Sequence, residues 1–144
     1  MMIRIKKLNE NATMPNRAHE ADAGADLFAC LTEEVHIPPH STVKIPTGIA
    51  VEVPLGWFGA IFARSGLATK NSLRPANCVG VCDCGYTGEY IVPLHNDSDR
   101  EKVIKPNERI AQLVIMPCMK ADFVWVNDLD ETDRGDGGFG SSGK

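Results

Sequence analysis

The chain has 144 residues, of which 43% are hydrophobic and 24% charged, and its formal net charge is −4 at pH 7. Such a length and balance predict one globular domain, because no apolar run approaches the roughly 20 residues of a membrane span and no secretory signal opens the sequence. The negative charge and the lack of a Lys- and Arg-rich run argue against nucleic-acid binding. We therefore expect a cytoplasmic protein with neither a membrane nor a nucleic-acid partner.

Short apolar segments with alternating or β-branched residues recur along the chain. Strands are expected at residues 3–8, 43–45, 49–53, 57–63, 89–94 and 111–116. Turn signals separate them, among them Pro46-Thr47-Gly48 and Pro54-Leu55-Gly56. The best helical segment is a turn or two at residues 65–71. This pattern predicts an all-β fold, a closed or jelly-roll β-barrel.

Residues 63–68 follow a predicted strand and open the predicted helical turn. Arg64, Ser65 and Gly66 would bring a guanidinium group, a hydroxyl and free backbone N–H groups together there, an arrangement that suits phosphate oxygens. Because Arg-Ser-Gly is a common tripeptide, a surface turn with a solvated arginine is the ordinary interpretation of these residues taken alone.

Residues 80–89 look like a β-hairpin, with Asp83 just before its turn and Tyr86 just after it, so that both could face one ligand. An aspartate in a turn more often caps backbone N–H groups, and a strand tyrosine more often packs against neighbours. Asp83, however, has small and apolar neighbours in the sequence. Its carboxylate is a candidate base for a water that attacks a phosphorus atom.

The end of the chain, from Arg134 to Lys144, contains five glycines and two serines in addition to Phe139. These residues have too little apolar surface to build a core, so we expect a barrel domain of residues 1–127 and an arm of residues 128–144. Glycine N–H groups can surround an anion, Arg134 adds charge, and Phe139 can stack on a flat ring. The arm therefore indicates a phosphorylated ligand that carries a base, and a disordered tail is the alternative.

Five segments of the chain together resemble the trimeric dUTP pyrophosphatases, the dUTPases, in their order and spacing. They are AGADL at 23–27, RSGLA at 64–68, Asn77 with GVCD at 80–83 and YTGE at 86–89, ERIAQL at 108–113, and RGDGGFGSSG at 134–143. Each segment is a weak signal alone, whereas five in this order form a specific pattern.

The resemblance implies a jelly-roll homotrimer whose shared active sites hydrolyse dUTP to dUMP and pyrophosphate, which lowers dUTP and supplies dUMP for thymidylate synthesis. Asp83 would be the catalytic residue that orients and deprotonates a water attacking the α-phosphorus. Substrate-binding roles are implied for Arg64, Ser65, Gly66 and Gln112 at the phosphates, for Asn77, Val81, Cys82, Asp83 and Ile91 at uracil, for Tyr86 beneath the deoxyribose, and for Arg134, Phe139, Gly140, Ser141 and Ser142 in the closing arm.

A Mg²⁺ cofactor is also implied, and Asp26 would act on it indirectly, through a bound water. Such an ion would hold the triphosphate in one bent conformation and neutralise charge on the leaving pyrophosphate.

The five cysteines form an odd set without a C-x-x-C pair, which favours reduced thiols over a disulfide framework or a zinc site. Cys82 stands where the dUTPases usually have an aliphatic residue, and Cys84 where serine is frequent. Because both flank Asp83, we expect peroxide to lower activity and reductant to restore it.

Two further interpretations stay open. The related dCTP deaminases resemble this barrel but use a glutamate-centred site, and the protein could instead be a dUTP-responsive regulatory binding protein. Asp83, Tyr86 and the glycine-rich tail favour the pyrophosphatase. An inert β-barrel oligomerisation module would leave these residues without a role.

Overall fold

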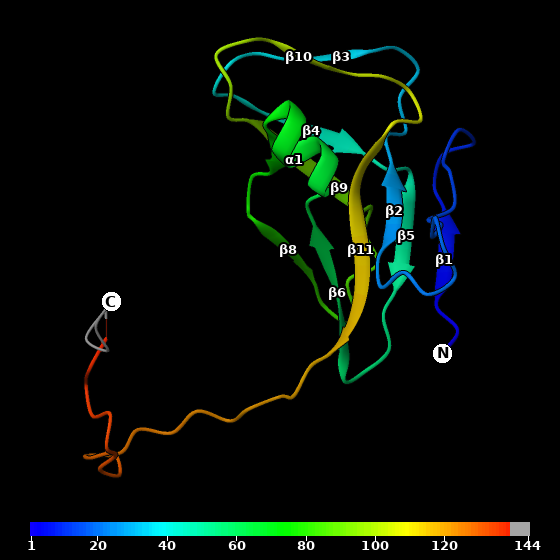
Figure 1. Ribbon diagram of the computed structural model, residues 1–144. Helices are drawn as coiled ribbons and strands as arrows, with labels where there is room; N and C mark the ends of the chain where they lie inside the picture. Colours follow the sequence, from blue (N-terminus) through cyan, green and yellow to red (C-terminus); the bar gives the residue numbers. More distant parts are fainter. Residues whose placement is uncertain (139–144) are drawn as a thin grey trace.

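Antiparallel β-strands make up the body of the protein in the computed structural model, which describes residues 1–138 (Figure 1). In chain order the elements are β1 (Arg4–Lys7), β2 (Ala25–Phe28), β3 (Val35–Ile37), β4 (Thr42–Pro46), β5 (Ile49–Glu52), β6 (Trp57–Phe62), α1 (Ser65–Asn71), β7 (Leu73–Pro75), β8 (Val79–Cys82), β9 (Ile91–Asn96), β10 (Lys102–Ile104) and β11 (Arg109–Pro117). The predicted all-β class is confirmed, and the fold is a jelly roll.

The strands form four small sheets, with orders β1-β5, β10-β3, β4-β9-β7 and β2-β11-β6-β8. In the last of these, Gln112 of β11 lies opposite Asp26 of β2 on one side and Phe62 of β6 on the other. A register shift between Arg109 and Ala111 interrupts the pairing with β2. Bulges of this kind re-aim side chains near functional sites. The sheet thereby brings positions far apart in the sequence to the point where β6 leads into α1.

One apolar core lies between the sheets, and β9 shows how the sequence builds it. Its side chains alternate between buried Val92, Leu94 and Asn96 and the more exposed positions between them. The period of two is that of a strand with one face on a core. Asn96 is buried without an unpaired amide, because its Nδ2 donates to the carbonyl oxygens of Ile37 at 3.0 Å and Arg100 at 2.8 Å.

The predicted helix and the predicted strands are all present, with ends that differ by a residue or two. The helix covers Ser65–Asn71 and ends at Ser72, whose φ of 56° is left-handed and whose N–H donates to the carbonyl oxygen of Leu67. Strands β2, β3, β7, β8 and β10, each of three or four residues, were not predicted.

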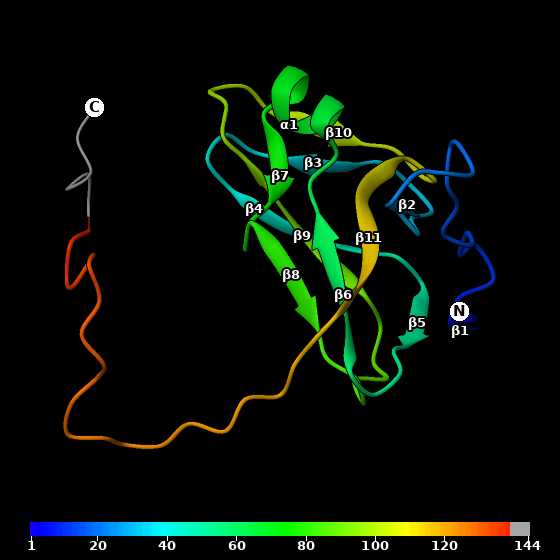
Figure 2. The same ribbon diagram turned by 60° about the horizontal axis from the view of Figure 1, so that its bottom comes forward.

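The predicted β-hairpin at residues 80–89 is wrong. β8 pairs with β6, as Figure 2 shows, whereas β9 pairs with β4 and β7, so the segment crosses from one sheet to another. The crossing is held by contacts to the turn between β4 and β5. The backbone N of Tyr90 donates to the Ile49 carbonyl at 2.9 Å, and the Gly48 N donates to Glu89 Oε1 at 2.8 Å. These bonds carry the chain away from β8 after the turn.

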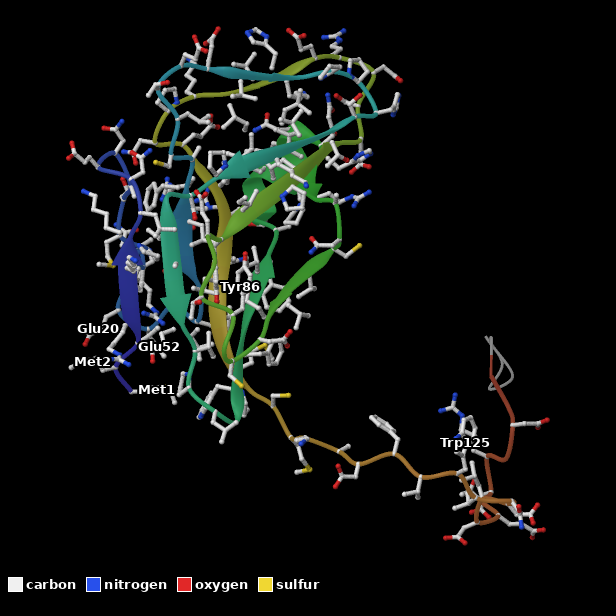
Figure 3. All side chains as sticks on the ribbon, turned by 180° about the vertical axis from the view of Figure 1, so that it is seen from behind. Met1, Met2, Glu20, Glu52, Tyr86 and Trp125 are labelled. Atoms are coloured by element: carbon white, nitrogen blue, oxygen red, sulfur yellow. The ribbon has the colours of Figure 1, made fainter. Side chains whose placement is uncertain are left out.

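After Pro117 the chain leaves the sheets and runs away from the body, with neither strand nor helix in residues 118–138 (Figures 1 and 3). This segment presents large apolar side chains to solvent, since Phe123 is 95% exposed and Trp125 is fully exposed. Within residues 1–138, no helix combines the length and the apolar character needed to cross a membrane.

Candidate active site

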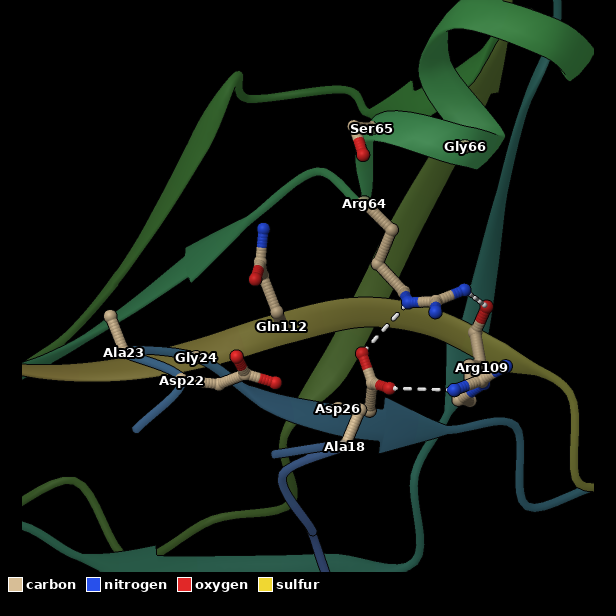
Figure 4. Close-up of a pocket in the computed structure, with 10 residues that line it drawn as sticks. All are labelled: Ala18, Asp22, Ala23, Gly24, Asp26, Arg64, Ser65, Gly66, Arg109 and Gln112. Carbon is tan, nitrogen blue, oxygen red and sulfur yellow. Dashed lines mark hydrogen bonds and ion pairs between the residues drawn. The ribbon is translucent and has the colours of Figure 1, made fainter. Parts of the chain in front are cut away.

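A cleft of about 360 Å³ opens where β2, β11 and the start of α1 meet (Figure 4). Its lining consists of Ala18, Asp22, Ala23, Gly24, Asp26, Arg64, Ser65, Gly66, Arg109 and Gln112. The structure therefore brings together the residues that the sequence predicted at the phosphates and Asp26 of β2, which the resemblance implied as an indirect Mg²⁺ residue. We call this space the phosphate cleft.

Two guanidinium groups flank the Asp26 carboxylate in this cleft, as the dashed lines of Figure 4 show. Arg64 donates from Nε to Asp26 Oδ1 at 2.7 Å, and Arg109 donates from Nη1 to Oδ2 at 3.3 Å. The Asp26 side chain is only 13% exposed, whereas that of Arg109 is 50% exposed. The shared carboxylate thus holds both cations at the wall of the cleft, where charged phosphate oxygens could accept their remaining N–H groups.

Gln112 reaches the cleft from β11 and is fixed on two sides. Its Nε2 donates to the Ala63 carbonyl at 2.9 Å, just before the Arg64-Ser65-Gly66 turn. On the other side it lies against Gly24, where an added Cβ would come within 2.4 Å of Gln112 Oε1 and 3.2 Å of its Cβ. A side chain at position 24 would therefore displace the Gln112 amide.

A second cleft, of about 280 Å³, lies along β8 and the start of β9. Its lining consists of Ile61, Asn77, Gly80, Val81, Cys82, Asp83, Tyr86, Glu89, Tyr90 and Ile91. All the residues that the sequence predicted at uracil and deoxyribose are in this set, together with the candidate base. We call it the Asp83 cleft.

The turn that presents Asp83 and Tyr86 forms as predicted. The Tyr86 N–H donates to the Asp83 carbonyl at 3.2 Å, and Gly85 between them has a φ of 91°, which favours glycine. Tyr86 folds back over the chain, and its hydroxyl donates to the Glu89 carbonyl at 2.9 Å. Gly88 makes this possible, because a Cβ there would lie 2.6 Å from the Tyr86 hydroxyl oxygen.

Thiol chemistry in the Asp83 cleft is set by burial. Burial raises the pKa of the Cys82 thiol, so the reactive thiolate is scarce at neutral pH. Cys84 is exposed, and all five cysteines of the chain are free thiols.

The structure leaves some predicted contacts apart. The phosphate cleft and the Asp83 cleft share no lining residue. Arg134 lies in the arm, where its Nε donates to the Gly137 carbonyl at 3.0 Å. Phe139, Gly140, Ser141 and Ser142, also predicted to bind substrate, lie outside the described residues.

Several lining residues had no role assigned from the sequence, and Arg109 and Tyr90 are the two that matter most for the site. Arg109 stands in the ERIAQL segment, which was recognised without a role for its arginine, and its partnership with Asp26 depends on strand pairing across 83 positions. Tyr90 lines the Asp83 cleft while being 1% exposed, and a buried strand-end tyrosine carries no distinguishing sequence signal.

Direct coordination of a metal ion has no support in residues 1–138, where no three His, Cys, Asp or Glu side chains gather suitably. Both Asp26 oxygens are already engaged by arginines. This donor set fits Mg²⁺ acting through water, because Mg²⁺ keeps several waters and is commonly held by substrate phosphates with one or two carboxylates.

Comparison with known proteins gives one consistent result. The sequence profile of the dUTPase family matches residues 10–143. The deoxyuridine 5'-triphosphate nucleotidohydrolase of Desulfitobacterium hafniense (strain DSM 10664 / DCB-2) is 48% identical over 131 residues, which cover 90% of this chain and 87% of that protein.

Solved structures agree. The Staphylococcus bacteriophage 80alpha dUTPase with dUPNHPP, which is described as controlling transfer of virulence genes, superposes with a TM-score of 0.90 at 32% identity, covering 99% of both chains. A mutant dUTPase from phage phi11 of S. aureus, in which a structural Mg(II) ion is coordinated, has a TM-score of 0.81 at 27% identity, covering 91% of this chain and 100% of that one. With the family profile spanning nearly the whole sequence, this chain belongs to the dUTPase family.

Proposed function

We propose that this protein is a dUTP diphosphatase that hydrolyses dUTP to dUMP and pyrophosphate, lowering dUTP and supplying dUMP for thymidylate synthesis. The observation that carries the proposal is the sorting of the motif residues into two clefts. Those that a triphosphate needs line one cleft, and those that a pyrimidine nucleoside needs line the other. Family membership supports the same reaction.

Asp83 is the proposed catalytic residue. Its carboxylate is exposed in the cleft, and the following turn holds it between β8 and Tyr86. From there it orients a water in line with the α-phosphorus and accepts a proton from it as the new P–O bond forms. The leaving group is pyrophosphate. Positioning the water supplies as much of the rate as the proton transfer does.

The phosphates are held by Arg64, Ser65, Gly66 and Gln112 in this proposal. Arg64 can keep its present partners when phosphate binds, because Nε donates to Asp26 and Nη1 donates to the Arg109 carbonyl at 3.4 Å, while Nη2 has no hydrogen bond within residues 1–138 and can donate to a phosphate oxygen. Mg²⁺ is the proposed cofactor, held by the triphosphate and by Asp26 through water, and when bound it neutralises charge that builds on the pyrophosphate.

The base and sugar are read in the Asp83 cleft. Backbone groups around Val81, Cys82 and Ile91 form hydrogen bonds with uracil, with help from Asn77. The close fit of this segment around the base leaves no room for the methyl group of thymine. Tyr86 lies beneath the deoxyribose. A ribose hydroxyl would be desolvated there without a hydrogen-bond partner, so UTP is rejected.

We also propose a homotrimer with shared active sites, divided into a barrel domain of residues 1–127 and an arm of residues 128–144. Two features support it: the clefts share no residue, and the segment after Pro117 exposes apolar side chains such as Trp125. The arm closes over bound nucleotide, with Arg134, Ser141 and Ser142 on phosphate oxygens and Phe139 and Gly140 over uracil. Five free cysteines suit the proposed cytoplasmic location.

The test is product analysis with a panel of deoxynucleotides, with and without Mg²⁺. Pyrophosphate from dUTP, without ammonia, is expected. Asp83→Asn should abolish turnover and keep dUTP binding, measured by calorimetry. Asp99→Asn is the matched control, since that side chain is 96% exposed and lines neither cleft. An active Asp83→Asn enzyme would contradict the assigned role.

The arm is tested by deleting residues 134–144. Turnover should be lost while the assembly, measured by light scattering, stays intact. Full activity of the truncated protein would remove the arm from the mechanism.

The alternatives have separate signatures. A dCTP deaminase would release ammonia from dCTP. The second alternative is a regulatory protein that binds dUTP and a protein partner, with hydrolysis secondary, and the phage 80alpha dUTPase is a precedent for it. In that case Asp83→Asn would keep the regulatory effect.

A further inference from the structure

Tyr90 is held firmly at the back of the Asp83 cleft. Its side chain is 1% exposed, and its backbone is fixed at both polar groups. The N–H donates to the Ile49 carbonyl at 2.9 Å, and the carbonyl accepts a hydrogen bond from the Thr47 hydroxyl. The backbone at residue 90 therefore has little freedom to move.

The ring of Tyr90 supports the ring of Tyr86. Their centroids lie 6.1 Å apart with 28° between the planes, a stacked arrangement within the favourable range for aromatic pairs. Tyr86 itself is 47% exposed, so one face of its ring is open to the cleft and the other rests on Tyr90.

The hydroxyl end of Tyr90 packs against Gly59 of β6. A Cβ at Gly59 would lie 3.1 Å from the Tyr90 hydroxyl oxygen, so the absence of a side chain there makes room for the phenol. That oxygen is buried and has no hydrogen-bond partner of normal geometry in residues 1–138, and the polar group beside it is the Cys82 thiol. Packing against Tyr86 and Gly59 therefore contributes more to the position of the ring than its polar contacts do.

We propose that Tyr90 is a positioning residue for sugar specificity: its ring fixes the tilt of Tyr86, and so sets how strongly the enzyme rejects a ribose. The inference rests on the proposed function, in which Tyr86 lies beneath the deoxyribose. Gly88 and the Glu89 carbonyl restrain Tyr86 at its hydroxyl end, but Tyr90 supports the face of the ring. Without that support the ring can tilt and admit the 2'-hydroxyl.

The experiment compares kcat/KM for dUTP with kcat/KM for UTP in the full-length protein. Tyr90→Leu should lower the dUTP:UTP ratio about 10-fold or more, a change typical of losing one steric element of a site. Tyr90→Phe keeps the ring and should keep the ratio, with a midpoint of thermal unfolding equal to or above that of the wild type. Tyr90→Met fills the space without a flat ring and serves as a second aliphatic variant should Tyr90→Leu not fold.

A double-mutant cycle shows whether Tyr90 acts through Tyr86. Tyr86→Ala should lower the ratio by itself, and Tyr90→Leu should then change it no further. A ratio that stays at the wild-type value in folded Tyr90→Leu or Tyr90→Met, with only the melting temperature lowered, would overturn the inference. An additive effect in the Tyr86→Ala background would overturn it as well. If the wild-type protein does not hydrolyse dUTP, the proposed function fails first.

Discussion

Replacing Gly24 with alanine tests how the phosphate cleft is built. The φ of Gly24 is compatible with alanine, so the effect is steric. The new Cβ would lie 2.4 Å from Gln112 Oε1 and 3.1 Å from its Cδ, and the amide must rotate away. Rotation breaks the hydrogen bond from Nε2 to the Ala63 carbonyl. A lost hydrogen bond of this kind costs about 0.5–1.5 kcal/mol, and overpacking adds about 1–3 kcal/mol.

The consequence for activity follows from the proposed role of Gln112. A hydrogen bond to a charged phosphate contributes about 1.5–3 kcal/mol, so kcat/KM for dUTP should fall roughly 10- to 150-fold. Urea unfolding gives the stability change, and pyrophosphate release gives the rate.

Gln112→Ala provides the matched background. Once that side chain is gone, alanine at position 24 has little to displace, so Gly24→Ala should add almost nothing in the double variant. Equal effects of Gly24→Ala with and without Gln112 would refute the steric explanation. So would a Gly24→Ala enzyme as stable and active as the wild type.

Three further predictions concern the surroundings of the clefts. At Gly66 in α1 an added Cβ meets no atom within 4 Å, so Gly66→Ala should stabilise the fold by about 0.5–1 kcal/mol in urea unfolding. Turnover should nevertheless fall, because the new methyl group would occupy space beside the proposed phosphate position; unchanged turnover would mean that the phosphates do not bind at Gly66. Because burial raises the pKa of Cys82, maleimide should label exposed Cys84 before Cys82, as followed by mass spectrometry, and Cys84→Ser should remove the expected peroxide sensitivity; faster labelling of Cys82 would contradict this. The hydrogen bond that His36 donates to the Glu101 carboxylate raises the pKa of His36, so the stabilisation is present below about pH 6.5 and lost as pH rises through the folded pKa; His36→Gln should therefore destabilise more at about pH 5.5 than at about pH 8.5, and an equal loss at both would refute it.

The sequence predicted the strands that carry several apolar residues, because their alternation and flanking turns are local signals. Strands such as β3 (Val35–Ile37) and β10 (Lys102–Ile104) were missed because each is short and owes its conformation to pairing with the other. The hairpin error has a similar origin. The turn before Tyr86 is visible in the sequence, whereas the bonds that carry Tyr90 toward Ile49 depend on residues some forty positions away.

The site was predictable where motifs name residue types and unpredictable where packing selects partners. Asp26, Arg64 and Gln112 were expected from three separate segments, and the structure places them in one cleft. Arg109 joins them through its ion pair with Asp26, beside a register shift in β11 that the sequence does not reveal. The contact at Gly24 was also unpredictable, because the residues around it in the sequence do not show that a glutamine from β11 lies against it.

The two clefts without a common residue have a genetic consequence. If each working site draws one cleft from one copy and the second from another, a copy damaged at Arg64 and a copy damaged at Asp83 can rescue each other when mixed, because some pairings contain an intact half of each kind. By the same reasoning, a chain damaged at both positions would spoil two sites of such an assembly, whereas a chain damaged at one position would spoil only one.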